Sequence, residues 1–215
     1  MNVELAGEHL QLAPEKAIWW SARNTLLIAD AHFGKAASFR ARGVPVPEAS
    51  TGGTLAALDA LIVRYAPERI VFLGDMLHAR EAHAIETVAA MQVWRARHTA
   101  LHLVLVEGNH DLHAGAPHAS LNIEVVPEPF IDGPFALCHH PVPHAPGYTL
   151  AGHLHPAYRL STARESVRLP CFWFGDQVGV LPAFGQFTGA KAITPRAGDR
   201  IFVIAEDRVF AAPRA

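Results

Sequence analysis

The stretch that decides the fold is Ile70-Val71-Phe72-Leu73-Gly74-Asp75, in which four apolar residues run directly into a glycine and an aspartate. A short apolar run of this kind is typical of a strand that is buried on both faces, and Gly74 permits the tight turn that ends it. The same arrangement recurs at 101–111, LHLVLVEGNHD, where the apolar run ends in a glycine followed by Asn109, His110 and Asp111. Both stretches predict a buried strand followed by a polar loop.

Two segments with apolar residues at helical spacing alternate with three apolar runs, which predicts a βαβαβ order for the first half of the chain. A hairpin is expected before this unit, with strands in Val3–Leu12 and Ala17–Trp20. The predicted helices are Ser50–Tyr65 and His83–His98, and the predicted strands are Leu26–Ala29, Ile70–Leu73 and Leu101–Val106.

The second half is rich in short strands that are separated by stretches of proline and glycine. A βαβαβ unit followed by such strands predicts an α/β sandwich of mixed sheets with helices outside. A length of 215 residues without a linker or an internal repeat predicts a single domain over 1–215. The expected strands are Phe135–Cys138, Tyr148–Ala151, Val167–Phe174, Ile201–Ala205 and Arg208–Ala211, the last two forming a hairpin.

Composition excludes several classes of protein. Half of the residues are hydrophobic and 18% are charged, which excludes a disordered chain. A net charge of −2 argues against a basic protein that coats nucleic acid. Cys138 and Cys171 form no CxxC pair, so we expect neither a disulfide framework nor a thiolate zinc site. The N-terminus has no signal-peptide pattern and no apolar run is long enough to span a membrane, so we expect a cytoplasmic protein.

Five of the predicted strands share one feature: each leads into a turn that contains aspartate, asparagine or histidine. Ligands of open α/β sheets bind in the crevice outside the carboxyl ends of the strands, so we expect these side chains to converge. In an extended turn, residues i and i+2 point the same way and can present two ligands together. The residues at the strand ends are Asp30, His32, Asp75, Asn109, His139, His140, His153 and His155.

Carboxylate, amide oxygen and imidazole make a mixed ligand set that suits Mn²⁺, Fe or Zn²⁺ better than Ca²⁺. With only one of the adjacent His139 and His140 counted, seven such ligands exceed what one tetrahedral ion needs. They fit two divalent ions that share a bridging carboxylate and clamp both oxygens of an in-line phosphoryl displacement. The sequence therefore predicts a dinuclear centre for phosphoryl chemistry.

The ordered motifs DAH, GD, GNHD, HHP and GHLH, which run from Asp30 to His155, resemble those of the calcineurin-like metallophosphoesterase superfamily. This resemblance implies a four-layer α/β/β/α sandwich of two mixed sheets flanked by helices. Residues 30–47, DAHFGKAASFRARGVPVP, resemble the ligase-associated DNA-damage-response endonuclease group, as do GDMLHAR, GHLHPAYRL and the segment 170–195. The resemblance covers nearly the whole chain.

The resemblance also implies a role for each ligand. Asp75 would bridge the two ions, and a hydroxide between them would be the nucleophile. His110 would protonate the leaving group, and Asp111 would fix its tautomer by accepting from the other ring nitrogen. One ion would be held by Asp30, His32 and His155, and the other by Asn109, His139 and His153.

Two assignments stay open between alternatives at this point. Adjacent residues of a strand face opposite ways, so either His139 or His140 is the ligand, and the resemblance favours His139 while leaving His140 to line the cleft. Four residues that follow the metal motifs contact either the substrate phosphate or only solvent. These candidates for substrate binding are Lys35, Arg40, His78 and Arg80.

The function predicted is that of a dinuclear phosphodiesterase, a DNA endonuclease of DNA repair that uses Mn²⁺. Because the chain has no added nucleic-acid-binding domain, the resemblance implies that a DNA ligase or a helicase serves as its partner. A nucleotide or cyclic-nucleotide phosphodiesterase or a phosphatase on the same fold is the main alternative. A non-catalytic scaffold is the other, and His110 argues against it because a scaffold has no need of a leaving-group acid.

Overall fold

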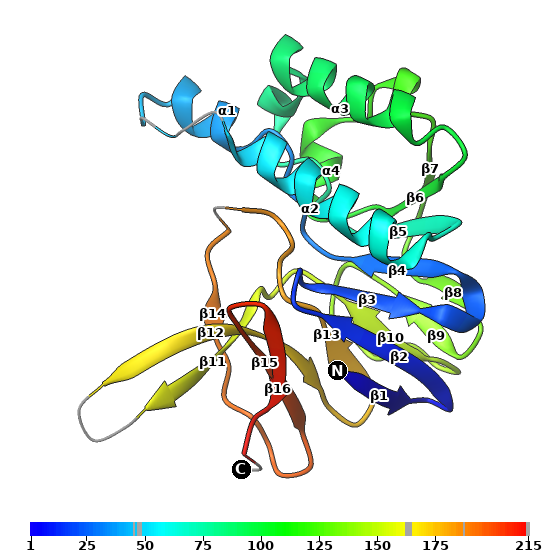
Figure 1. The fold of residues 1–215 in the computed structure, drawn as a ribbon, viewed down its shortest axis with the longest axis vertical. Helices are drawn as coiled ribbons and strands as arrows, with labels where there is room; N and C mark the ends of the chain where they lie inside the picture. Colours follow the sequence, from blue (N-terminus) through cyan, green and yellow to red (C-terminus); the bar gives the residue numbers. More distant parts are fainter. Residues whose placement is uncertain (45, 47–48, 162–164, 187, 214–215) are drawn as a thin grey trace.

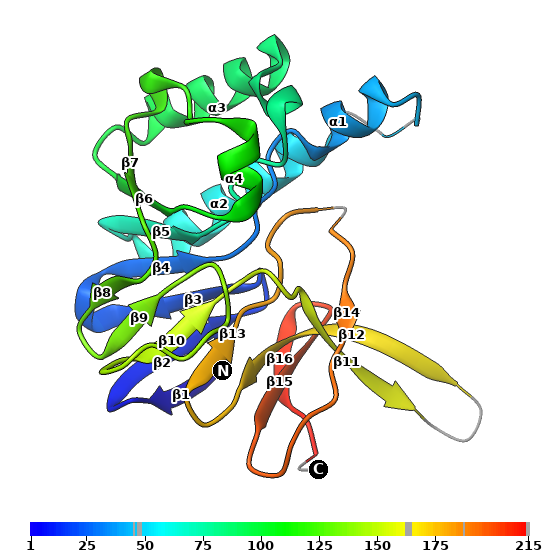
Figure 2. The ribbon, with the colours of Figure 1, turned by 180° about the vertical axis from the view of Figure 1, so that it is seen from behind.

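The computed structural model describes residues 1–44, 46, 49–161, 165–186 and 188–213. Two mixed β-sheets pack face to face, and the α-helices cover the outer face of the first sheet (Figures 1 and 2). This arrangement confirms the predicted α/β class with two mixed sheets.

The first sheet has the strand order β1-β2-β3-β4-β5-β6-β7, antiparallel from β1 to β4 and parallel from β4 to β7. The predicted hairpin is confirmed in β2 and β3. The expectation of a strand throughout Val3–Leu12 is wrong, because Ala6 and Gly7 adopt φ values of 50° and 81° and turn the chain. The strands are β1 (Asn2–Leu5), β2 (Glu8–Ala13), β3 (Ala17–Trp20), β4 (Thr25–Ile28), β5 (Arg69–Leu73), β6 (His102–Val106) and β7 (Ile123–Val126).

Two of the helices were predicted, and two short ones were not. The long helices α2 (Ala49–Tyr65) and α3 (Ile85–Arg97) lie where the apolar spacing placed them. The short helices α1 (Lys35–Ala41) and α4 (Asn109–Ala114) begin inside the polar motifs that we expected to be loops. The chain also forms the 3₁₀ turns η1 (Ser21–Arg23), η2 (Arg80–His83) and η3 (Ala119–Leu121).

The second sheet follows the order β14-β11-β12-β13-β10-β9-β8, with β15 pairing with β12 and β16. The predicted C-terminal hairpin is confirmed by the antiparallel pairing of β15 and β16. The strands are β8 (Phe130–Asp132), β9 (Phe135–Leu137), β10 (Tyr148–Ala151), β11 (Pro156–Ser161), β12 (Ser166–Phe174), β13 (Val178–Val180), β14 (Lys191–Ala192), β15 (Arg200–Ala205) and β16 (Arg208–Ala211).

The parallel strands of the first sheet are buried on both faces, which is why their sequences are apolar without alternation. In β5, Ile70 and Phe72 pack against the helices, whereas Val71 and Leu73 pack between the two sheets. The cluster between the sheets also takes in Phe172 of the second sheet. Burial on both faces fixes the strand ends from which the polar loops leave.

The four α-helices within the described ranges all precede residue 115 and lie on the first sheet. Among the described residues, no α-helix lies on the outer face of the second sheet, so the layers are helix, sheet and sheet, without the second helical layer that the resemblance implied. The reason is local, because the strands of the second sheet are joined by turns and by segments rich in proline and glycine. None of the helices formed by the described residues is long and apolar enough to cross a membrane.

Candidate metal centre

The polar loops after the strands of both sheets meet at one edge of the molecule. The N–H of Asp30 donates to the carbonyl of Gly74 (3.2 Å) and that of His32 to the carbonyl of Asp75 (2.9 Å), so the loops after β4 and β5 remain paired. A β-bridge between Ala29 and Ala183 joins the first sheet to the segment that follows β13. These backbone hydrogen bonds and the β-bridge therefore hold the two loops against the second sheet.

Five of the predicted ligands occupy the left-handed region of backbone conformation. Their φ values are 53° for Asp30, 47° for His32, 47° for Asp75, 69° for His153 and 48° for His155. The pairs at i and i+2 do converge, but through left-handed residues rather than through the extended turn that we expected. Left-handed conformations of non-glycine residues are uncommon and gather at functional sites.

The first of two groups of ligand atoms surrounds the ring of His155. Its Nε2 lies 3.6 Å from Oδ1 of Asp30 and 3.3 Å from Nε2 of His32. Nε2 of His32 in turn lies 3.9 Å from Oδ2 of Asp75. These side chains come from the loops after β4, β5 and β10.

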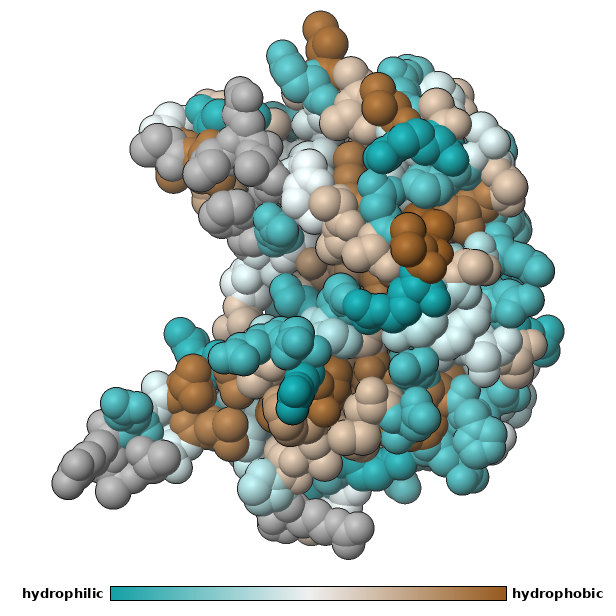
Figure 3. All heavy atoms as spheres, in the orientation of Figure 1, coloured by the Kyte–Doolittle hydropathy of each residue, from teal (hydrophilic) through white to brown (hydrophobic). Residues whose placement is uncertain are grey.

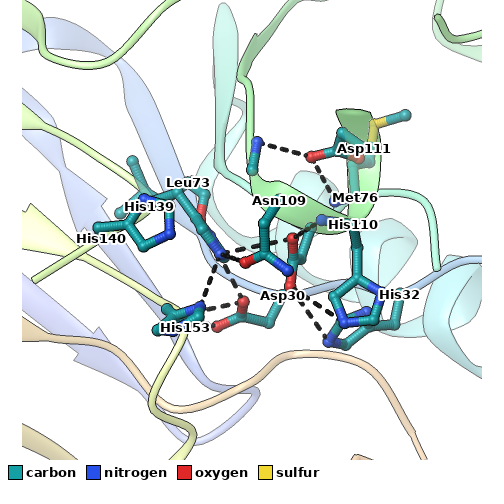
Figure 4. Close-up of polar contacts among 12 residues, drawn as sticks. Asp30, His32, Leu73, Met76, Asn109, His110, Asp111, His139, His140 and His153 are labelled. Atoms are coloured by element: carbon teal, nitrogen blue, oxygen red, sulfur yellow. Dashed lines mark hydrogen bonds and ion pairs between the residues drawn. The ribbon is translucent and has the colours of Figure 1, made fainter. Parts of the chain in front are cut away.

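The second group surrounds Nε2 of His139, which is fully buried (Figure 4). This atom lies 2.9 Å from Oδ1 of Asn109 and 3.0 Å from Nδ1 of His153. Oδ1 of Asp75 is 3.4 Å away. The second group thus draws on the loops after β5, β6, β9 and β10.

Asp75 belongs to both groups, since its Oδ2 faces His32 and its Oδ1 faces His139. Oδ1 also accepts the backbone N–H of His110 at 2.9 Å, which holds the carboxylate in this orientation. Burial raises the pKa of Asp75, and the hydrogen bond from His110 opposes that rise. A carboxylate with one oxygen toward each of two donor groups is the arrangement that a bridging ligand requires.

Burial keeps most of the histidines in the neutral form that metals bind. It lowers the pKa of His32 and His153, and it lowers the pKa of His139 to about 4. Burial also acts to lower the pKa of His155, but the hydrogen bond and the charge of Asp30 outweigh it and raise the pKa overall. Asp30 therefore attracts positive charge to the first group.

Main-chain carbonyls orient two of the rings. Nδ1–H of His139 donates to the carbonyl of Leu73 (3.3 Å), and Nδ1–H of His155 donates to the carbonyl of Gly189 (3.0 Å). Each ring therefore turns its Nε2 toward the carboxylates, as a metal-binding histidine does. With its carboxylate, amide and imidazole donors, the site contains several groups of side chains that could hold a metal ion.

Solved structures of other proteins match this chain. No protein-family model and no curated protein matches the chain. The crystal structure of the Pseudomonas putida nuclease MPE superposes with a TM-score of 0.87 at 47% sequence identity, and the match covers 99% of both chains. The chain belongs to the family of this nuclease.

Within this MPE family member, the two adjacent histidines after β9 have different environments. His139 is buried against Asp75 and Asn109, whereas Nδ1 of His140 pairs with Oε1 of Glu128 at 2.5 Å. The His140 side chain is 41% exposed and its ring lies 4.8 Å from that of His153. His139 therefore lies inside the second group of donor atoms, and His140 lies at the rim of the site.

Glu128 is a site residue that the sequence analysis missed. Its Oε2 accepts the backbone N–H groups of His139 (2.8 Å) and His140 (2.9 Å), and the two hydrogen bonds fix the chain as it leaves β9. The only signal in the sequence is an acidic residue between Pro127 and Pro129, shortly after a strand. That pattern alone does not indicate a role.

The predicted partnership of His110 and Asp111 is wrong. Nδ1–H of His110 donates to the carbonyl of His78 at 2.6 Å, and not to Asp111. The Asp111 carboxylate accepts the backbone N–H groups of Leu77 (2.8 Å) and Gly108 (3.0 Å), and burial raises its pKa to about 7. Asp111 therefore ties the loop after β5 to the start of α4, because its side chain points back along its own helix rather than toward His110.

The four candidates for substrate binding lie in two different environments, two near the donor groups and two at the exposed surface. Lys35 is half-buried and its charge interacts with Asp30 and Asp75, and burial lowers its pKa. Nδ1 of His78 lies 3.3 Å from Nδ1 of His32, so the site includes His78, and burial lowers its pKa to about 4.

The other two candidates are exposed. Arg40 lies near the end of α1, where its guanidinium donates to the carbonyl of Val46 (3.5 Å), and Arg80 begins η2. The structure thus brings Lys35 and His78 to the centre and leaves the two arginines at its periphery.

Proposed function

We propose that this protein is a dinuclear metal-dependent phosphodiesterase that cleaves DNA as an endonuclease in DNA repair. We further propose that it belongs to the calcineurin-like metallophosphoesterase superfamily and, within it, to the ligase-associated group. The observation that carries the proposal is the position of Asp75, whose two oxygens face two separate groups of donors. The similarity to a nuclease from Pseudomonas putida supports the reaction type.

In this proposal Asp75 would help to hold both ions. When bound, two divalent ions supply the Lewis acidity that an in-line displacement at phosphorus needs. Mn²⁺ suits the mixed oxygen and nitrogen donors, and Fe or Zn²⁺ would also be accepted. The first ion would be held by Asp30, His32 and His155, and the second by Asn109, His139 and His153.

We assign the role of proton donor to the leaving group to His110. Its Nδ1–H is held by the carbonyl of His78, so Nε2 is the atom left to carry a proton toward the substrate. That Nε2 lies 4.0 Å from Oδ2 of Asp75, and the side chain is 39% exposed. A proton at this position can reach a leaving-group oxygen beside the ions without passing through a ligand.

Positive charge near the centre would bind the phosphates of the substrate. Lys35 is the candidate closest to the carboxylates, and Arg40 and Arg80 would meet phosphates farther along the strand. His78 would act beside His110 and His32, on which its ring packs. Because the net charge is only −2, we propose that a DNA ligase or a helicase delivers the enzyme to its substrate. The two free, buried cysteines fit a reducing compartment such as the cytoplasm.

The test is metal reconstitution followed by a comparison of substrates. Protein stripped with EDTA is reloaded with Mn²⁺, Zn²⁺ or Fe²⁺, and its metal content is measured by elemental analysis. Rates are then measured on bis-p-nitrophenyl phosphate, on p-nitrophenyl phosphate, and on single-stranded and duplex DNA. We expect two ions per chain, the highest rate with Mn²⁺, and faster turnover of the diester than of the monoester.

Other outcomes would point elsewhere. One ion per chain would refute the dinuclear mechanism. Faster turnover of the monoester would favour the phosphatase alternative, and diester hydrolysis without cleavage of DNA would favour a nucleotide phosphodiesterase. No hydrolysis with any metal would favour the scaffold.

A further inference from the structure

The hairpin formed by β11 and β12 directly follows the motif GHLH, whose last residue is His155. Its first strand, Pro156–Ser161, begins at the residue after His155. β12 is buried at Cys171, Phe172 and Phe174, whereas its first three residues, 166–168, are exposed. The distal half of the hairpin therefore extends beyond the core, as Figures 1 and 2 both show.

Two arginines sit directly opposite each other on this distal half. Arg159 of β11 pairs with Arg168 of β12 in the antiparallel register, and both side chains are exposed. Directly opposite side chains have their Cβ atoms about 4.5–5.5 Å apart, and like charges in such positions destabilise a hairpin. Within the described ranges, neither guanidinium forms a hydrogen bond or an ion pair. Among the described residues, neither positive charge is therefore neutralised by a direct ion pair.

The strand period places the arginine pair on the inner face of the hairpin. Alternate residues of β12 share a face, so Arg168 lies on the side of Phe172 and Phe174, which pack toward the first sheet. The opposite face carries Tyr158 and Leu169, which pack against an outer cluster. The arginines therefore face the side of the molecule on which the first sheet and α1 lie.

That side of the molecule is concave. Figure 3 shows the surface hollowed between α1 and the β11–β12 hairpin, with the hairpin forming one wall. Lys35, whose charge interacts with Asp30 and Asp75, is the first residue of α1, the element on the other side of this hollow. Arg159 lies four residues beyond His155, about 13 Å at ~3.3 Å per residue. This distance corresponds to about four nucleotides at ~3.4 Å along a DNA strand.

We propose that the β11–β12 hairpin is a nucleic-acid-binding arm whose Arg159 and Arg168 contact backbone phosphates on one side of the cleaved bond. The inference rests on the proposed nuclease function and specifies where the rest of the substrate lies. Phosphates between the two guanidinium groups replace their mutual repulsion with two charge-assisted hydrogen-bonded contacts. The arm binds the backbone and not the bases, so it does not select a sequence.

The test compares two double variants that remove the same charge from different places. In the first, Arg159→Gln and Arg168→Gln are combined. In the control, Arg97→Gln and Arg208→Gln remove two arginines that pair with Asp59 and Asp207, outside the hollow. Binding of a fluorescein-labelled 24-nucleotide single strand and of its duplex is measured by anisotropy between 50 and 300 mM NaCl. Hydrolysis of both DNAs and of bis-p-nitrophenyl phosphate is measured with the Mn²⁺-loaded proteins.

We expect kcat/KM for DNA to fall at least about ten-fold more than kcat/KM for the small diester in the hairpin variant. The slope of log K against log[NaCl] should decrease by about 1.8 for duplex and about 1.4 for single-stranded DNA, the values for two lost phosphate contacts. Lysine at both positions should restore most of the binding. Because the pair repels, the melting temperature of the glutamine variant should equal or exceed that of the wild type.

The outcomes separate the arm from the nuclease function itself. If the wild type cleaves DNA and the hairpin variant binds and cleaves it equally well, the arm is refuted and the nuclease function stands. Equal weakening of both double variants, or a lower melting temperature for the hairpin variant alone, would also refute the arm. If the wild type hydrolyses the small diester but neither binds nor cleaves DNA, the DNA substrate and the arm are both wrong.

Discussion

The Nδ1–H group of His110 donates to the backbone carbonyl of His78 at 2.6 Å, and the two rings stack with their centroids 4.9 Å apart. A main-chain carbonyl, and not a carboxylate, therefore sets the tautomer of the proposed proton donor. Because the loop after β5 supplies both this carbonyl and Asp75, the proposed proton donor and the proposed bridging carboxylate are positioned by the same loop, residues 74–79.

His110→Ala should retain both metal ions and lose rate. The ring faces the substrate side, so its removal takes no ligand from either group, and loss of a general acid costs roughly 10²–10⁴-fold. The deficit should be smaller on bis-p-nitrophenyl phosphate than on DNA, because p-nitrophenolate needs little protonation to leave. Metal stoichiometry and rates on both substrates check this, with the exposed His118→Ala as the control. An equal deficit on both substrates would argue against the acid role, and a lost ion would make His110 a ligand.

Asp75→Asn should lose metal and activity together. The change removes the negative charge that both donor groups share while keeping the shape of the side chain. Elemental analysis after gel filtration should find fewer than one ion per chain, and hydrolysis of DNA should fall to background. The control is Asp59→Asn, the same change at a surface residue that pairs with Arg97 and His98. A variant that keeps two ions and full activity would remove the basis of the dinuclear proposal.

Gly108→Ala should disturb the centre by contact alone. The φ of Gly108 is −100°, which alanine adopts freely, but an added Cβ would lie 2.5 Å from both Oδ1 and the backbone N of Asp75. We expect weaker metal binding and a lower melting temperature. Gly52→Ala is the matched control, because an added Cβ there meets no atom within 4 Å. As the fourth residue of α2, alanine there should stabilise the protein by up to about 1 kcal/mol. Full metal occupancy in Gly108→Ala would show that the site relaxes around the methyl group.

Both cysteines should be inert in the folded protein. Burial raises the pKa of Cys138 and of Cys171 to about 12, and the thiolate is the reactive form. At pH 8, far below this pKa, the thiols remain protonated and covered. DTNB should therefore react with fewer than one thiol per chain in buffer and with two in guanidinium chloride. Rapid reaction of one thiol in the native protein would show that its strand opens locally.

The sequence was sufficient for the buried strands that lead into the polar loops and for the positions of the polar residues in those loops, because both depend on local patterns. It did not predict β7, β8, β11, β13 and β14. Unbroken apolar runs such as Ile70–Leu73 indicate burial on both faces, and a polar residue at the end of each run indicates a shared edge. The helices α2 and α3 follow from apolar spacing over more than three turns. The short helix α4 has no such pattern, since its six residues are mostly the polar motif itself.

Interactions through the main chain could not be predicted. The partner of His110 is a carbonyl oxygen, which every residue has, so no residue type marks it. Glu128 was missed because its role depends on the backbone N–H groups of His139 and His140, eleven and twelve residues later. Arg159 and Arg168 gained meaning only when the register placed them opposite each other.

Of the eleven described non-glycine residues with positive φ, five are proposed ligands of the two ions. Each such conformation costs roughly 1–3 kcal/mol. The strain free energy of the five residues together is therefore comparable to the net stability of a whole domain. The surrounding sheets must supply that energy. Glycine at any of these five positions would relieve the backbone strain and raise the stability of the protein. Each such substitution would also remove a proposed ligand. The family can become more robust only by improving the rest of the fold.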